Sequence, residues 1–150
     1  MSVAVALEIN LSRLVAGLSD EPAADMSALA RAGEELDIEW PDDYLAMMSQ
    51  RDGGEGEVGA WYVQLWPAES LVQNNADYPA DDEDLDQVVF IGSDGADEGI
   101  AIERATGNVL LVPWIGSKAD WILLGRDLTE AFGRFERDDV LDEAVHPYGG

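Results

Sequence analysis

The residues with the greatest potential for chemistry are the carboxylates of an acidic run near the middle of the chain. Five of the six positions from 81 to 86 carry acids, and these are Asp81, Asp82, Glu83, Asp84 and Asp86. Carboxylates at this density suit the ligation of a hard cation, acid–base catalysis or the attraction of a basic macromolecule. A run of like charge is also typical of a solvated loop. The rest of the sequence disfavours the first two uses.

The spacing of the acids does not indicate a metal site. A calcium loop of the EF-hand type has acids at alternate positions, a central glycine and a distal glutamate. Neither the segment 77–86 nor the segment 94–98 has that pattern. We therefore expect cations to bind only adventitiously, and we predict no dedicated metal site.

Catalytic signals are equally sparse. The chain has no cysteine and one histidine, His146, which excludes cysteine nucleophiles and thiolate or multi-histidine zinc sites. His146 lies in a tail, 138–150, that we predict to be loose, so a serine–histidine triad would lack an ordered base. The glycines between 53 and 59 are not followed by the Gly-Lys-Ser/Thr of a phosphate loop. We predict neither a cofactor nor an enzymatic activity.

The net charge limits the classes of partner. The chain carries 32 acidic and 8 basic side chains, and its formal charge is −24. Such a surface repels DNA, RNA and anionic lipid, and it attracts cations and basic proteins. We therefore expect a protein partner, and neither a nucleic acid nor a membrane. Solubility or a salty habitat is the alternative explanation for the bulk of the charge.

The length and composition favour one soluble domain over residues 1–150. A chain of this size buries roughly 68–70% of its unfolded surface, and 47% of its residues are hydrophobic. The apolar segment 1–18 lacks a basic start and is interrupted by Glu8 and Arg13, so we predict neither a signal peptide nor a membrane span. The absence of cysteine fits a cytoplasmic protein.

The helices and strands that position these residues can be predicted from the periodicity of apolar residues. Apolar residues at helical spacing predict an extra N-terminal helix within 1–20, a helix over 24–37, a third that starts at Pro41 and stops at Gly53-Gly54, and a closing helix over 126–136. Strands are predicted at 58–65, 87–92, 99–104 and 108–113. A short helix at 67–72 and an exposed acidic loop at 74–86 lie between the first two strands. This order of elements predicts an α+β domain.

Several local motifs occur in a recognisable order. A helix start, Trp40-Pro41-Asp42-Asp43-Tyr44-Leu45, is followed by the stop Asp52-Gly53-Gly54 and by Leu65-Trp66-Pro67-Ala68-Glu69-Ser70-Leu71. Strands with glycine-rich turns follow, and Leu128-Thr129-Glu130-Ala131-Phe132 begins the closing helix. Over about residues 26–135 this series resembles the SMI1/KNR4 family of the SUKH superfamily. Trp40 stands where the family usually has leucine, and Ile100 where an aromatic residue is common.

The resemblance implies a fold and two kinds of function. The fold is a single α+β domain with N-terminal helices, a mostly antiparallel sheet of about four to six strands and a closing helix. Many bacterial members are immunity proteins that neutralise polymorphic toxins, often nucleases, by direct and non-catalytic binding. A second branch comprises regulatory or scaffold proteins that act through protein interactions. Both branches imply a protein-binding module.

Charge and resemblance together suggest which residues contact a basic toxin domain. The hypothesis gives steering and rim contacts to the acidic run at 81–86, together with Glu55 and Glu57. Apolar anchors would be Trp61, Trp66 and Trp114. The alternatives remain plain solvation for the acidic run and core or half-buried packing for each tryptophan.

Overall fold

The N-terminal part of the molecule is helical. The computed structural model describes residues 11–77, 83–115 and 118–137, with the backbone alone at residues 83 and 84. Helical backbone covers residues 11–14, and Leu18 then forms an isolated bridge with Gly56. Two longer helices follow, α2 (Met26–Leu36) at the predicted place and α3 (Asp42–Met48), which begins as predicted but ends before the predicted stop at Gly53-Gly54.

Local chemistry explains where these helices begin and end. The side chain of Asp25 accepts hydrogen bonds from the N–H groups of Ser27 and Ala28, which caps the start of α2. Asp37 ends the helix in the left-handed conformation, with φ of 54°. Pro41 immediately precedes α3, as its fixed φ and missing N–H favour.

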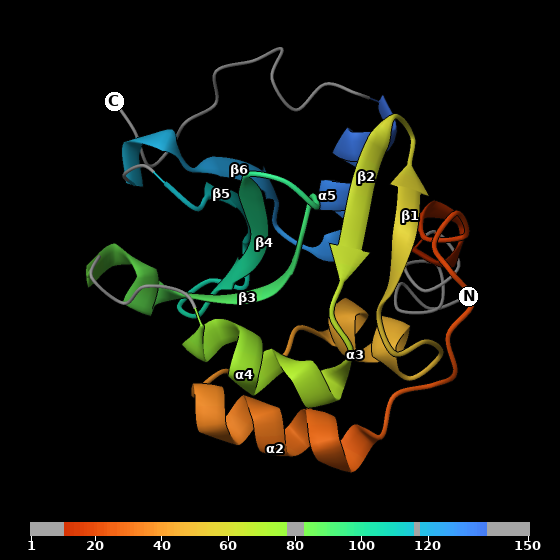
Figure 1. Cartoon of the computed structure of the whole chain (residues 1–150), viewed down its shortest axis with the longest axis horizontal. Helices are drawn as coiled ribbons and strands as arrows, with labels where there is room; N and C mark the ends of the chain where they lie inside the picture. The colour runs from red at the N-terminus through yellow and green to blue at the C-terminus, as the bar shows by residue number, and fades with distance from the viewer. Residues whose placement is uncertain (1–10, 78–82, 116–117, 138–150) are drawn as a thin grey trace.

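The sheet has six antiparallel strands, each hydrogen-bonded to the next one along the chain (Figure 1). The strands are β1 (Gly54–Val58), β2 (Trp61–Leu65), β3 (Val88–Ser93), β4 (Glu98–Glu103), β5 (Val109–Pro113) and β6 (Ile122–Gly125). The closing helix α5 (Leu128–Arg137) contacts both edge strands, β1 and β6. The sheet therefore curls around α5, and the α+β prediction is confirmed.

Two strands differ from the sequence prediction. The predicted strand at 58–65 is the second half of a hairpin, because Gly59 adopts a φ of +61° and turns the chain between Val58 and Trp61. Strand β6 was not predicted, since Leu124 continues the apolar spacing of the closing helix. The helix begins only after Asp127, whose carboxylate accepts a hydrogen bond from the N–H of Glu130 at 2.8 Å.

The predicted acidic loop at 74–86 contains helical structure at both ends. Helix α4 (Leu71–Ala76) extends into it from one side, and a 3₁₀ helix, η2 (Glu83–Gln87), forms the other side. The Asn75 side chain hydrogen-bonds both the N–H and the carbonyl oxygen of Phe90, at 2.8 and 2.9 Å. These two hydrogen bonds connect α4 to the buried strand β3.

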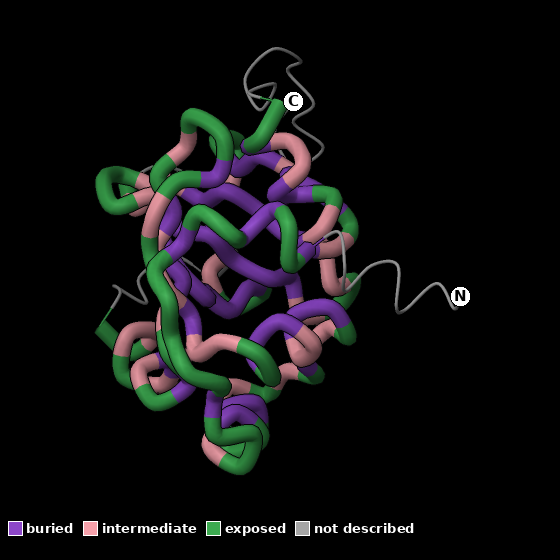
Figure 2. Tube along the Cα trace, turned by 90° about the vertical axis from the view of Figure 1, so that its right-hand side faces the viewer, coloured by how far each residue is buried: buried purple, intermediate pink, exposed green. Residues whose placement is uncertain are grey.

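Apolar residues are buried on both faces of the central strands. One cluster lies under the helices and includes Val89, Ile91, Ile100 and Ile102. A second cluster lies on the other face of these strands and consists of Val88, Phe90, Ala101, Leu110, Val112 and Trp121. Figure 2 shows these buried strands running through the middle of the molecule, with exposed loops around them. Burial on two faces explains why β3 to β5 appear as nearly continuous apolar runs.

Candidate protein-binding surfaces

The structure describes only one end of the acidic run. Asp81 and Asp82 lie outside the described residues, as do the side chains of Glu83 and Asp84, whose backbone begins η2. Asp86 is exposed, and its carbonyl oxygen accepts a hydrogen bond from Nη1 of Arg104. Nε and Nη2 of the same guanidinium donate to the carbonyl oxygen of Leu36, at 3.0 and 2.8 Å. Arg104 thus joins the end of the acidic run to the C-terminal end of α2.

The other two predicted carboxylates belong to the β1–β2 hairpin. Glu55 Oε2 accepts hydrogen bonds from Tyr62 Oη at 2.7 Å and from Gln64 Nε2 at 3.1 Å. The bond to Glu55 is the main cause that raises the pKa of Tyr62 above its ordinary value. Glu57 is exposed and lies opposite Tyr62 in the strand register. In Figure 1 this hairpin lies on the right and η2 on the left, so the fold does not bring the hairpin carboxylates beside Asp86.

All three predicted anchor tryptophans are half-buried and packed inside the protein. The ring of Trp61 lies 5.1 Å from that of Phe135 in α5. Trp114 lies 5.0 Å from Phe90, and its Nε1 donates to the carbonyl oxygen of Ala96 at 3.2 Å. Trp66 packs against both apolar clusters. Each ring therefore stabilises the fold and offers only part of its surface to a partner.

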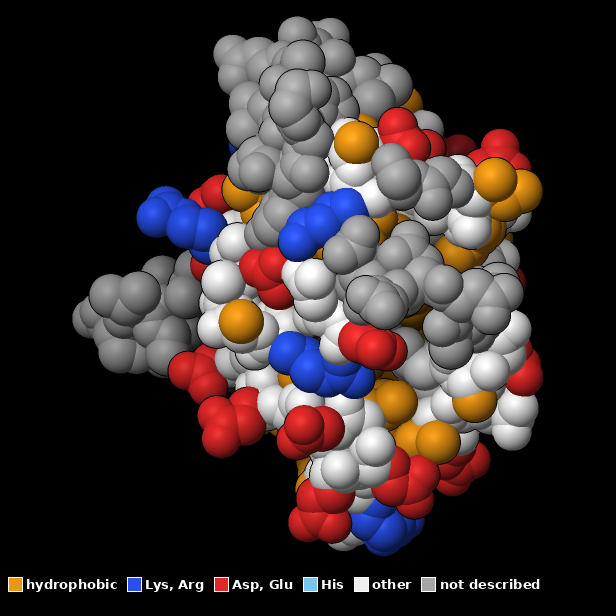
Figure 3. Space-filling model, turned by 90° about the vertical axis from the view of Figure 1, so that its left-hand side faces the viewer, with side chains coloured by type: hydrophobic (Ala, Val, Ile, Leu, Met, Phe, Trp, Pro, Cys, Tyr) orange, Lys and Arg blue, Asp and Glu red, His pale blue; other side chains and the backbone are white. Residues whose placement is uncertain are grey.

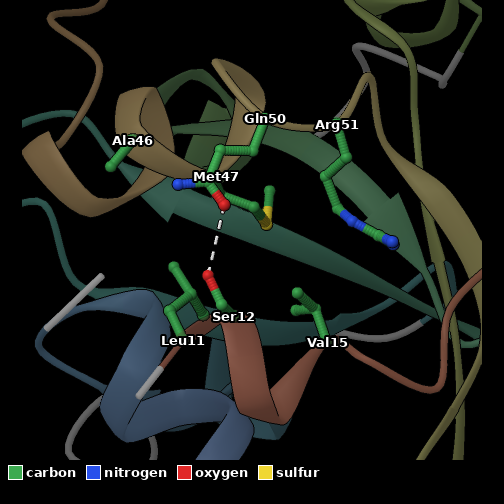
Figure 4. A pocket seen from close by; sticks show the side chains of 7 residues that line it. All are labelled: Leu11, Ser12, Val15, Ala46, Met47, Gln50 and Arg51. Carbon is green, nitrogen blue, oxygen red and sulfur yellow. Dashed lines mark hydrogen bonds between the residues drawn. The ribbon is translucent and has the colours of Figure 1, made fainter. Parts of the chain in front are cut away.

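A small cavity separates the N-terminal helical turn from the end of α3 (Figure 4). It encloses about 200 Å³ and is lined by Leu11, Ser12, Val15, Ala46, Met47, Gln50 and Arg51. Ser12 Oγ donates to Gln50 Oε1 at 3.2 Å across it. Nη1 of Arg51 is buried and has no hydrogen-bond partner in the described part of the chain. The lining contains no carboxylate and no histidine, which leaves the cavity without a general acid or base.

A wider groove runs along α2 and the segment that leads into α3. Its volume is about 590 Å³, and it is lined by Met26, Ala30, Gly33, Glu34, Asp37, Ile38, Glu39, Trp40, Leu45 and Arg104. Sequence reasoning placed Met26 and Ala30 in the apolar stripe of a helix, but the fold leaves both exposed. The apolar stripe is wider than the face that α2 buries, but the sequence does not show which of its residues stay exposed.

Two titratable side chains of α3 are buried. Burial raises the pKa of Asp43, as does the charge of Asp127, whereas hydrogen bonds from Thr129 and Leu128 lower it; the net shift is upward. Burial likewise raises the pKa of Tyr44 well above its ordinary value. Both side chains are buried in α3, and burial is the main cause of both shifts.

Neither a metal cluster nor a membrane-spanning helix occurs in the described ranges. No three acidic, cysteine or histidine side chains converge there in a way that would hold a metal ion. No helix of those ranges has the length and apolarity needed to cross a bilayer.

Comparison with known proteins adds one match. A family model described as SMI1 / KNR4 family (SUKH-1) matches residues 23–134. These residues run from the turn before α2 into α5, so the match includes the groove, the hairpin and the whole sheet. No curated protein matches the chain.

Proposed function

The chain belongs to the SMI1/KNR4 family (SUKH-1), and on that premise we propose that it is an immunity protein that neutralises a cognate polymorphic toxin by direct binding. Proteins of this family are generally non-catalytic and of the immunity or regulatory type. A binding module needs a stable domain with an exposed and complementary surface. The described fold and the charge of the chain are consistent with that requirement.

The observation that carries the immunity proposal is the net charge of −24 in a member of this family. A nuclease presents a basic surface to its phosphodiester substrate. An acidic protein is complementary to that surface and excludes the nucleic acid when it covers the cleft. Long-range attraction raises the association rate by a factor of about 10 to 10³ at low salt.

Steering does not by itself supply affinity. A tight interface also needs a few apolar side chains that fill pockets and lose their contact with water. The acidic run, Glu55 and Glu57 remain our candidates for the steering surface, and Trp61, Trp66 and Trp114 for apolar contact. Because the rings pack internally, each contributes through the part of its surface that stays accessible.

The test is co-expression with the product of the large gene adjacent to the gene for this protein, which the proposal expects to be the toxin. We expect growth to be restored and the two proteins to co-purify. With purified components, toxin activity should fall linearly with the amount of this protein added and reach zero at an equimolar ratio, because a tight-binding inhibitor acts stoichiometrically. Inhibition far below equimolar amounts would point to catalysis. A folded protein that neither rescues nor co-purifies would contradict the proposal and favour the regulatory or scaffold role.

A further inference from the structure

The groove along α2 has an apolar floor that is fixed in position. Trp40 lines the groove with the small part of its surface that is exposed, 9%, and the indole Nε1 donates to the carbonyl oxygen of Leu29 at 2.8 Å. Gly33 makes this close approach possible, because a Cβ at that position would lie 2.8 Å from the same nitrogen. The indole is therefore held against α2 before any partner arrives.

Exposed apolar atoms lie along the floor. Met26 is 39% exposed, and Ala30, one helical turn further on, is exposed as well. Ile38 and Leu45 are half-buried and also line the groove. Burying an apolar side chain here would remove apolar surface from water on both partners, which favours binding.

The rim is acidic and its charge is not neutralised. Glu34, Asp37 and Glu39 are exposed, and the described part of the chain gives none of them an ion pair. The lining has one cation, Arg104, whose donors are directed at the carbonyl oxygens of Leu36 and Asp86. Three carboxylates and one guanidinium leave the groove lining with a net formal charge of −2, which gives it a negative potential.

The C-terminal end of α2 adds to this potential. Helices carry a partial negative charge at that end, which favours a cation. The last turn of α2 contains no basic residue that would satisfy the preference. Asp37 and Glu39 follow directly in the sequence and line the groove.

Arg104, which lines the groove, also donates to the carbonyl oxygen of Asp86, the described end of the acidic run. On the face shown in Figure 3, acidic side chains lie around hydrophobic patches in the lower half of the molecule, with some basic side chains among them; α2 lies at this level in Figure 1. A basic segment drawn toward Asp86 would therefore approach the groove residue Arg104.

We propose that this groove receives, from the partner protein, a segment that presents one large apolar side chain flanked by lysine or arginine. The inference rests on the proposed function and names the face and the chemistry of the partner. The apolar side chain would rest on Trp40 beside Met26, and the cations would lie against the acidic rim. A second copy of this chain is a poor occupant, because two chains with a charge of −24 each would repel.

The test uses two synthetic peptides with acetylated and amidated ends, Lys-Lys-Leu-Lys-Lys and Lys-Lys-Gly-Lys-Lys. They carry the same charge and differ in the apolar side chain. Binding is followed by NMR on the ¹⁵N-labelled full chain at about 0.15 M salt, where interactions between distant surface charges are screened. We expect the leucine peptide to shift the signals of Met26, Ala30 and the Trp40 indole, and to bind about tenfold more tightly than the glycine peptide.

A matched pair of variants locates the site. Glu34 and Glu35 are adjacent exposed residues of α2, and only Glu34 lines the groove. Glu34→Lys should weaken binding of the leucine peptide about tenfold, and Glu35→Lys by less than about twofold. Equal binding of the two peptides, equal effects of the two variants or shifts confined to other elements would overturn the proposal.

The toxin assay separates this inference from the proposed function. If Glu34→Lys loses peptide binding but still neutralises the toxin as well as the wild type, the groove is not the toxin-binding face. If the wild-type protein binds the leucine peptide in the groove but neutralises no toxin, the groove site stands and the immunity proposal fails.

Discussion

The carboxylate of Asp43 in α3 accepts a hydrogen bond from the backbone N–H of Leu128, 85 residues further along the chain, at 2.8 Å. The same oxygen accepts from the N–H of Thr129 at 3.1 Å. Leu128 is the first residue of α5, so Asp43 satisfies two donors that the helix leaves unpaired. One side chain thereby connects the N-terminal helices to the closing helix.

Replacing Asp43 should destabilise the protein. Asp43→Ala leaves one buried and one part-buried donor without an acceptor, and we expect a loss of about 2 kcal/mol in the free energy of unfolding. Asp43→Asn should cost less, because its amide oxygen still accepts. Urea denaturation measures both. The control is Asp42→Ala at the exposed neighbour, and an equal loss there would contradict the capping role.

The pH dependence of stability should reflect two acids that lose contact with water on folding, the buried Asp43 and the half-buried Glu98. The pKa of Asp43 is raised from the ordinary value of 3.8, and that of Glu98 from 4.5, mainly by burial in both cases. The folded state therefore binds these protons more tightly than the unfolded state. Their contribution to stability is present below the ordinary pKa values and is lost as the pH rises through the folded values.

We accordingly expect the free energy of unfolding to rise as the pH is lowered from about 7 toward the ordinary pKa values of the carboxyl groups. Falling net charge acts in the same direction, so the comparison must be between variants. Glu98→Gln removes one titrating group and should flatten the profile obtained by urea denaturation. A profile parallel to that of the wild type would show that Glu98 does not contribute.

Local patterns specify much of this fold because they report burial within one element. The nearly continuous apolar runs of β3 to β5 have the composition of strands that are covered on both faces. The hairpin turn after Val58 was missed because Gly59-Ala60 lies within a run that otherwise has the composition of a strand. Strand β6 escaped because Leu124 fits the helical spacing of its neighbours.

Which residues remain exposed on the surface is harder to predict from the sequence, because exposure depends on contacts between distant segments. Nothing local to Asp43 shows that it caps a helix 85 residues away. Nor does the spacing of Met26 and Ala30 show which edge of α2 stays uncovered. The tryptophans were selected as anchors by residue type, whereas Trp61 and Trp114 owe their positions to Phe135 and Phe90.

Two helical glycines should respond oppositely to replacement by alanine. Alanine favours helices by about 1 kcal/mol over glycine. At Gly33, however, the new Cβ would lie 2.8 Å from the indole nitrogen of Trp40. We expect Gly33→Ala to cost about 1–3 kcal/mol through displacement of the ring, visible as a change in tryptophan fluorescence.

Gly133 in α5 is the matched control. A Cβ there would meet only the end of the flexible Arg137 side chain, at 3.2 Å. Gly133→Ala should therefore stabilise the protein by up to about 1 kcal/mol. Stabilisation by both replacements would show that Trp40 is not constrained by Gly33, and would remove the fixed floor from the groove.

The acidic run should govern how fast a basic toxin is captured. Replacing Asp81, Asp82 and Asp84 together by asparagine removes three charges from one segment and should lower the association rate at low salt by about threefold, with dissociation nearly unchanged. Stopped-flow measurements against the cognate toxin at rising salt give both rates. The difference should shrink as the salt increases, because screening removes long-range attraction.

A double variant, Glu55→Gln with Glu57→Gln, tests the distant hairpin in the same way. If it slows association as much for each charge removed, net charge alone is responsible; if only the variant of the acidic run slows association, the partner approaches from the side of the molecule where η2 meets the groove.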